Sequence, residues 1–183
     1  MAKQRFHLER EADTSVLADF YSGVKSMDNF IHTRLSIFLR IYKNSRFYVL
    51  RNEDGLILAM CVLSPGQLFL DEDCKDDLRI KFPDIEERAD LKEYWEGGLF
   101  PSIEISYLAV SKEYQGMHIG SKLIDTIVKF KNDEFYNHPL FLSVDALCTK
   151  EYSAVGFYNK CRFWASEYMN VKLDTLRMYR TIH

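Results

Sequence analysis

Residues 103–124 limit the possible folds of this chain more than any other segment. The segment begins as an alternating apolar run typical of a strand, passes through a short polar turn with Gly116 and Gly120, and continues as a helix. Backbone N–H groups in such a loop can converge on an anion at the helix N-terminus. The segment therefore predicts a phosphate-binding turn, although two glycines also suit a plain helix entry with close packing.

Two common phosphate-binding motifs are missing from the sequence. No Gly-Lys-Ser/Thr motif of a P-loop occurs, and no Gly-x-Gly-x-x-Gly motif of a dinucleotide fold occurs. These two classes of nucleotide-binding protein are therefore excluded.

Helical and strand-like patterns alternate along the rest of the chain. Apolar residues recur at helical spacing over residues 26–42, and an Asp54-Gly55 turn joins two strand-like runs at 45–51 and 56–63. The second half predicts strands at 102–110, 140–144 and 176–182, and helices at 121–135 and 153–163. This alternation predicts an α/β or α+β fold in which helices cover a sheet.

Length and composition favour one domain over residues 1–183. The chain has 183 residues, of which 47% are hydrophobic, and its four prolines mark no linker. Between residues 65 and 101 the pattern weakens into an acidic run and a predicted helix at 84–95. We interpret residues 65–101 as a surface insertion.

The charge, hydropathy and cysteines of the chain give little reason to expect nucleic acid, a membrane or a metal ion as a partner. A net charge of −3 favours neither nucleic acid nor an anionic membrane, although a local basic patch is compatible with that average. No apolar run approaches a membrane span and the N-terminus is charged, so we expect a cytoplasmic protein. The cysteines are widely spaced and suggest neither a disulfide framework nor a metal site: Cys61, Cys74, Cys148 and Cys161.

The end of the 102–110 run and the turn that follows resemble the acetyl-CoA signature of the GNAT N-acetyltransferase superfamily. That signature is Gln or Arg, two variable residues, Gly, one variable residue, and Gly or Ala, after a strand ending in an apolar Ala-Val pair. The matching residues are Leu108, Ala109, Val110, Gln115, Gly116, Met117, His118, Ile119 and Gly120. His118 replaces the first signature glycine, which implies strain if that position needs a positive φ.

A second resemblance covers residues 154–163, which are similar to the family's Ala-x-x-Phe-Tyr-x-x-x-Gly-Phe helix. Arg162 stands where the family usually has glycine, and Glu151 where many members have a CoA-contacting Asn. The resemblance extends from residue 102 to residue 163.

The resemblance implies a GNAT fold, in which helices flank a mixed, splayed sheet of about six to seven strands. It implies acetyl-CoA as cosubstrate and no metal. The backbone of Leu108, Ala109 and Val110 would bind pantetheine, and the amides from Gln115 to Ser121 would bind the pyrophosphate. A catalytic role for the His118 side chain is disfavoured, because the loop directs it toward the phosphates.

The resemblance also implies two candidate catalytic residues. Tyr158 matches the position that often protonates the departing CoA sulfur, and its alternative is a plain aromatic core residue. Glu104 lies six residues before Val110, where some GNAT histone acetyltransferases carry a catalytic base. Its alternative is a solvated strand carboxylate.

The sequence does not identify the amine that accepts the acetyl group. A lysine, a peptide N-terminus, an aminoacyl-tRNA or a small-molecule amine would each suit direct attack in a ternary complex, and acyl length is equally open. The acidic 65–101 segment favours a cationic amine, but a charged run is often only a solvated face.

Two further functions are carried as alternatives. The element order is also similar to GNAT toxins that acetylate aminoacyl-tRNA, which are expected to show a basic face, whereas this chain is mildly acidic. For that reason nucleic acid is not expected as a partner. A non-catalytic acyl-CoA-binding regulator is the other alternative, and edge pairing of the 176–182 strand is a route to a homodimer.

Overall fold

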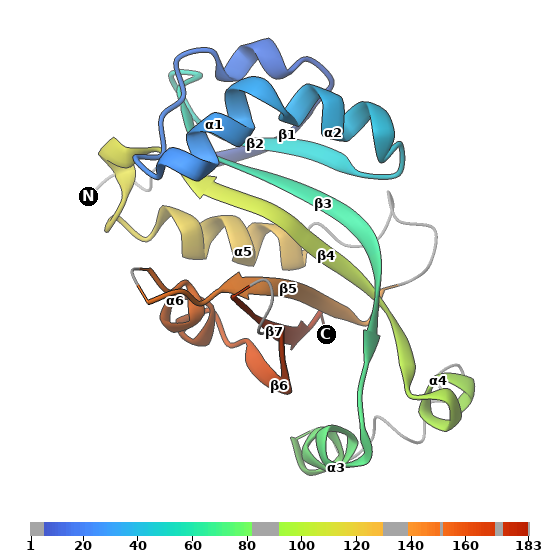
Figure 1. Cartoon of the computed structure of the whole chain (residues 1–183). Helices are drawn as coiled ribbons and strands as arrows, with labels where there is room; N and C mark the ends of the chain where they lie inside the picture. Colours follow the sequence, from blue (N-terminus) through green and yellow to red (C-terminus); the bar gives the residue numbers. More distant parts are fainter. Residues whose placement is uncertain (1–5, 82–91, 130–138, 151, 171–173, 183) are drawn as a thin grey trace. The chain divides into compact units, whose positions relative to one another are not determined.

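The computed structural model describes residues 6–81, 92–129, 139–150, 152–170 and 174–182 (Figure 1). Two compact units make up the chain, one formed by residues 1–64 and 105–131 and the other by residues 65–104 and 132–183. The single-domain organisation predicted for residues 1–183 stays a prediction.

Seven strands form one mixed sheet, and helices accompany them in both units. The strands are β1 (Phe6–Glu11), β2 (Arg46–Asn52), β3 (Ile57–Phe69), β4 (Leu99–Val110), β5 (Phe141–Leu147), β6 (Trp164–Asn170) and β7 (Thr175–Thr181). Their order in the sheet is β1-β2-β3-β4-β5-β7-β6, and the long strands β3 and β4 contribute to both units. The predicted α+β class and strand number are confirmed.

The first unit begins with an antiparallel meander of β1, β2 and β3. β1 pairs with β2 from Phe6 opposite Asn52, and β2 pairs with β3 from Arg46 opposite Leu63. Gly55 closes the hairpin between β2 and β3 at φ 80°, and its N–H donates to Asn52 O over 3.0 Å. A positive φ there requires the glycine, so the predicted hairpin is confirmed.

Two helices replace the single helix expected over residues 26–42. They are α1 (Lys25–Thr33) and α2 (Leu35–Ile41), with Arg34 between them at φ −122°. The Thr33 hydroxyl donates to Asn29 O over 2.7 Å. Such back-bonding competes with the helix ladder and bends helices, which accounts for the interruption.

The helices α1 and α2 pack on β2, β3 and the end of β4 (Figure 1). The buried side chains of this cluster are Leu17, Phe20, Ile31, Leu35, Phe47, Val49, Met60, Val62 and Ala109. Phe30 stacks on Tyr107 of β4 with ring centroids 3.6 Å apart, and burial raises the pKa of the Tyr107 phenol. Contact with β4 thus fixes α1 beside the strand that leads into the candidate phosphate turn.

The helix after the turn is α5 (Ile119–Lys129). Leu123, Ile124 and Ile127 of the predicted apolar stripe are buried, while Val128 is partly buried and Lys122, Asp125 and Lys129 face solvent. The stripe is confirmed, and residues 130–135 of the predicted helix lie outside the described residues.

The second unit joins β5, β7 and β6 as antiparallel neighbours. β5 pairs with β7 from Phe141 opposite Thr181, and β6 pairs with β7 from Trp164 opposite Tyr179. The sequence patterns did not predict β6. Because β7 lies between β5 and β6, it is not an edge strand, and the proposed homodimer contact through residues 176–182 is wrong.

Residues 65–101 contribute to the core of the second unit. The segment contains the end of β3, the helices α3 (Glu72–Lys81) and α4 (Lys92–Gly97), and the start of β4; residues 84–91 of the predicted helix lie outside the described residues. Their buried side chains pack with those of β5 and β7 in one cluster: Leu68, Leu70, Cys74, Leu78, Trp95, Phe100, Leu140, Phe141 and Tyr179. This packing differs from the surface insertion we expected, because apolar residues interrupt the acidic run at core-facing positions.

Candidate functional site

The turn between β4 and α5 is fixed by backbone hydrogen bonds to two other segments of the first unit. The Ser111 N–H donates to Leu58 O of β3 over 2.9 Å, and the Lys112 N–H donates to Tyr21 O over 2.9 Å. A short 3-10 helix, η4 (Lys112–Tyr114), follows. The turn is therefore anchored before it reaches the glycine positions.

The Gln115 side chain turns back toward the protein. Its amide Nε2 donates to Ser22 O over 2.7 Å and to Val110 O over 3.1 Å. Both amide hydrogens are thereby used to close the turn. The Gln115 Nε2 group therefore closes the turn and has no hydrogen left to donate to a ligand.

The backbone of the turn adopts the left-handed conformation twice. Gly116 has φ 77° and His118 has φ 60°, and a Cβ atom placed on Gly116 would meet nothing within 4 Å. The position of the first signature glycine thus does require a positive φ, and His118 occupies it at a conformational cost.

The amides of this turn divide into two groups. Those of Gln115 and Met117 bond to Lys112 O and Tyr114 O over 3.4 Å, and the first bond into α5 runs from Lys122 N to His118 O over 3.0 Å. The backbone N–H groups of His118, Ile119 and Gly120 precede that bond and have no acceptor inside the helix. Donors at a helix N-terminus, beside an open Gly116, fit an anionic diphosphate.

Tyr158 of the second unit is held by the end of a short helix. It lies in α6 (Val155–Lys160) and is 6% exposed. The Phe163 N–H donates to Tyr158 O and the Arg162 N–H donates to Asn159 O, each over 3.0 Å, while Arg162 has φ 66°. These bonds define a Schellman motif, in which Arg162 holds the position that usually belongs to glycine.

The apolar contact that accompanies this motif is made by Tyr158 itself. Its ring meets the Phe163 ring edge to face at 5.2 Å and the Phe157 ring at 5.0 Å. The Tyr158 ring is therefore oriented by the cap of its own helix, as a positioned acid requires.

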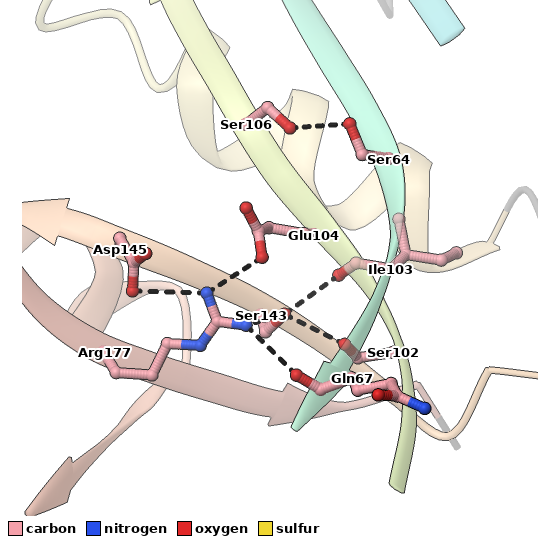
Figure 2. Close-up of polar contacts among 9 residues, drawn as sticks. All are labelled: Ser64, Gln67, Ser102, Ile103, Glu104, Ser106, Ser143, Asp145 and Arg177. Atoms are coloured by element: carbon pink, nitrogen blue, oxygen red, sulfur yellow. Dashed lines mark hydrogen bonds and ion pairs between the residues drawn. The ribbon is translucent and has the colours of Figure 1, made fainter. Parts of the chain in front are cut away.

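Glu104 lies in an ion-pair cluster of the second unit, centred on Arg177 of β7 (Figure 2). The Arg177 Nη1 atom lies 3.0 Å from Glu104 Oε2 and 3.2 Å from Asp145 Oδ1. The side chains of Arg177, Glu104 and Asp145 are 19%, 32% and 48% exposed, respectively. The cluster brings one cation between two carboxylates and carries a net negative charge.

Polar atoms of three further residues surround this cluster. Arg177 Nη2 donates to Ser143 Oγ over 3.3 Å and to Gln67 O over 3.4 Å, and the Ser143 hydroxyl donates to Ser102 Oγ over 3.2 Å (Figure 2). Gly66 leaves room for the Glu104 side chain, since a Cβ atom on Gly66 would lie only 3.2 Å from Glu104 Cβ. The guanidinium thus ties four strands together.

The candidate residues divide between the two units. The turn and the end of β4, with Ala109 buried and Leu108 and Val110 partly buried, belong to the first unit. Glu104 and Tyr158 belong to the second unit, and Glu151 lies outside the described residues.

Metal ligands, cysteines and membrane spans can also be assessed in the described residues. Among the described residues, no three or more His, Cys, Asp or Glu side chains gather as metal ligands. The four cysteines, all of them among the described residues, form no disulfide bond, and burial raises the pKa of the Cys61 thiol. Within the same residues, no helix is both long and apolar enough to cross a membrane.

Comparison with known proteins identifies the family. The profile of the acetyltransferase (GNAT) family matches residues 14–163, which include the turn, Glu104 and Tyr158. The chain belongs to this family. It is a GNAT acetyltransferase, and the predicted family and enzyme class are confirmed.

Solved structures of GNAT toxins share the fold of this GNAT acetyltransferase. A Tyr→Phe variant of KacT has a TM-score of 0.69 at 18% identity, with 98% of this chain and 96% of that chain covered. AtaT complexed with acetyl-methionyl-tRNAfMet has a TM-score of 0.60 at 18% identity, with 94% of each chain covered. AtaTR bound with acetyl-CoA has a TM-score of 0.58 at 17% identity, covering 97% and 93%. No curated protein sequence matches the chain.

These comparisons bear on the expectation that nucleic acid is not a partner. Structures of this fold include toxin complexes with tRNA and with DNA, so the expectation that nucleic acid is not a partner of this GNAT acetyltransferase is not supported.

Sequence reasoning missed several residues of the candidate site. Arg177 and Asp145 stand in unremarkable strands, so no spacing indicated their contact with each other or with Glu104. Their partners are distant in sequence, and only the folded sheet brings them together.

Proposed function

We propose that this GNAT acetyltransferase takes its acetyl group from acetyl-CoA and transfers it to a primary amine by direct attack in a ternary complex. The observation that carries the proposal is the turn from Val110 to Gly120, which has two left-handed residues and, at the start of α5, backbone amides that precede the first hydrogen bond of the helix. A solved structure of the same fold, AtaTR, is described as bound with acetyl-CoA.

Acetyl-CoA supplies a thioester carbonyl carbon that the neutral amine attacks and a thiolate that leaves when the C–S bond breaks. The backbone of Leu108 to Val110 binds the pantetheine arm. A backbone N–H donor directed at the developing oxyanion contributes a few kcal/mol in general, about 3. The amides of His118 to Gly120 hold the pyrophosphate.

Tyr158 donates its phenolic proton to the leaving sulfur. Its burial and its aromatic contacts with Phe157 and Phe163 support this role, since they keep the ring in one orientation. Glu104 is the proposed base for the acceptor amine. Arg177 holds its Oε2 atom, which orients the carboxylate relative to the sheet.

An acetylation assay tests the role of Tyr158. Release of the CoA thiol is followed with a panel of amines for the parent and for Tyr158→Phe, which removes only the phenolic oxygen. We expect kcat to fall by about 10²-fold, with little change in KM for acetyl-CoA. Tyr152→Phe is the matched control, because Tyr152 is 51% exposed. Equal activity of both variants would contradict the acid role.

The α-amino group of an aminoacyl-tRNA is a second candidate acceptor. AtaT, a solved structure of the same fold, is described in complex with acetyl-methionyl-tRNA. Residues 24–46 contain five Lys or Arg and one Asp, in contrast to the net charge of −3 for the chain. Lys25, Arg34, Arg40 and Lys43 are exposed, whereas Asp28 is buried.

These exposed cations lie on or beside α1 and α2, near the exposed apolar side chains of Ile37, Ile41 and Tyr42. A basic helical surface with aromatic residues suits the phosphate backbone of RNA. The surface therefore supplies the basic face that the average charge conceals.

Acetylation of charged tRNA at rising salt tests this acceptor. We expect Arg34→Glu and Arg40→Glu to raise KM for the tRNA and to weaken its salt dependence, because each removes a phosphate contact. Lys160→Glu, an exposed cation of α6, is the control. If free amines are acetylated and charged tRNA is not, the acceptor is a small molecule or a peptide.

A further inference from the structure

Asp28 is a buried carboxylate of α1 whose bonds lead toward the candidate acetyl-CoA turn. It is 8% exposed, and its Oδ1 atom accepts hydrogen bonds from Ser22 N over 2.7 Å and from Ser22 Oγ over 2.6 Å. The Ser22 hydroxyl in turn accepts from Val24 N over 3.2 Å. Asp28 therefore fixes both the backbone and the side chain of the residue that precedes Gly23.

The segment that Asp28 fixes is the one that holds the turn. Tyr21 O accepts the Lys112 N–H over 2.9 Å, and Ser22 O accepts the Gln115 side chain over 2.7 Å. Adjacent carbonyls of one segment thus bind the start and the end of η4. The Asp28 carboxylate is connected to the turn through Ser22 and Gln115.

Close packing makes this connection specific. Gly23 has φ 79°, and a Cβ atom there would lie 3.0 Å from Lys112 Cδ. The Lys112 ammonium lies 5.6 Å from the centroid of the Tyr21 ring. Residues 21–23 therefore pack against the Lys112 side chain in addition to their hydrogen bonds with the turn.

The other end of the connection is rigid. Ile31 of α1 is buried together with Leu17 and Phe20, and the His32 ring bonds to Phe20 O over 3.0 Å. Asp28 stands in the first turn of α1, where the helix N-terminus stabilises a negative charge. Its Oδ2 atom is buried and has no hydrogen-bond partner among the described residues.

We propose that Asp28 is a positioning residue for acetyl-CoA, which acts through Ser22 and Gln115 on the turn that binds the diphosphate. The inference rests on the proposed function of that turn. A loop that is held in its binding conformation loses less entropy when the ligand binds, so the connection raises affinity for acetyl-CoA without touching it. Asp28, Ser22 and Gln115 act in series, so loss of either the Asp28–Ser22 bonds or the Ser22–Gln115 bond releases the same turn.

Acetyl-CoA titrations of four variants test the inference. For Asp28→Ala and Gln115→Ala we expect Kd and KM for acetyl-CoA to rise about tenfold, or about 1.4 kcal/mol, with KM for the acceptor unchanged. The double variant should lose no more than either single variant, because the links act in series. Asp28→Asn keeps an Oδ1 acceptor for both Ser22 donors, so we expect it to restore binding to within about twofold.

Asp13→Ala is the matched control. Asp13 accepts the same pair of bonds, from Ser15 N over 2.9 Å and from Ser15 Oγ over 2.7 Å, but these bonds cap η1 (Thr14–Leu17). Its loss should leave Kd for acetyl-CoA unchanged.

Hydrogen exchange of the ligand-free proteins separates the inference from the proposed function. We expect faster exchange over residues 111–120 in Asp28→Ala and Gln115→Ala than in the parent and in Asp13→Ala. If the parent binds acetyl-CoA and the Asp28 and Gln115 variants bind it equally well, the inference is overturned while the proposed function stands. If the parent does not bind acetyl-CoA, the proposed function fails, and unchanged exchange would overturn the connection as well.

Discussion

Two residues of the chain occupy positions that normally belong to glycine, and both are left-handed. Arg162 at φ 66° closes the Schellman motif of α6, and His118 at φ 60° precedes α5. The sequence predicted strain at His118 from the missing signature glycine, and at Arg162 it showed only a departure from the family pattern. Glycine reaches this conformation without steric cost, so the two positions store a small strain beside the proposed acid and the proposed phosphate turn.

Arg162→Gly should stabilise the protein by about 1 kcal/mol, because relief of the left-handed strain exceeds the added entropy of the unfolded chain. Urea unfolding of the parent and the variant measures the difference. Lys160→Gly, two residues earlier at the end of α6, is the control and should lower stability by about 0.5–1 kcal/mol. A loss of stability in Arg162→Gly would show that the arginine side chain makes a compensating contact.

The Glu104–Arg177 pair gives a second prediction for a single residue. Glu104→Gln removes the charge and leaves an oxygen that can accept from Arg177, so we expect kcat to fall by about 10²-fold with KM for acetyl-CoA unchanged. Asp145→Asn removes the other carboxylate of the cluster and should have the smaller effect. An Asp145 variant as impaired as the Glu104 variant would assign the cluster to acceptor binding, with no base in it.

At the level of elements, sequence patterns predicted the hairpin, the apolar stripe of α5 and the turn, because local spacing and turn residues determine them. They did not predict β6, the interruption at Arg34 or the burial of residues 65–101. A hydroxyl bond from Thr33 to Asn29 accounts for the interruption, and the packing of Leu78 with strands distant in sequence accounts for the burial; neither contact can be identified from local spacing alone. The Arg177 cluster was missed for the same reason.

The burial of α3 predicts a large effect in a segment that sequence analysis placed on the surface. Leu78 is 1% exposed within the core cluster of the second unit, whereas Ile80 on the same helix is 78% exposed. Leu78→Ala should cost about 2–5 kcal/mol through lost burial and a cavity, and Ile80→Ala less than about 0.5 kcal/mol. Thermal unfolding of both variants measures this contrast, and equal effects would contradict the assignment of α3 to the core.

At the scale of the whole molecule, the two units supply different parts of the proposed reaction. The first unit carries the turn, the Asp28 connection and the basic surface of α1 and α2, and the second carries Tyr158 and the Glu104 cluster. Family membership explains why both sets occur in one chain. The acceptor is the feature that local motifs leave open, because it depends on surface charge and on residues that are distant in sequence.

The most direct test is a thermal-shift titration with acetyl-CoA of the parent, Gly116→Asn and Gly116→Asp. Both side chains tolerate the left-handed backbone and enter open space, so the two variants differ mainly in one negative charge. At 100 times Kd, acetyl-CoA should stabilise the parent by about 2.7 kcal/mol. Our account predicts that Gly116→Asn keeps most of this shift and Gly116→Asp loses most of it. No shift in the parent, or equal shifts in all three proteins, would contradict a diphosphate site at this turn.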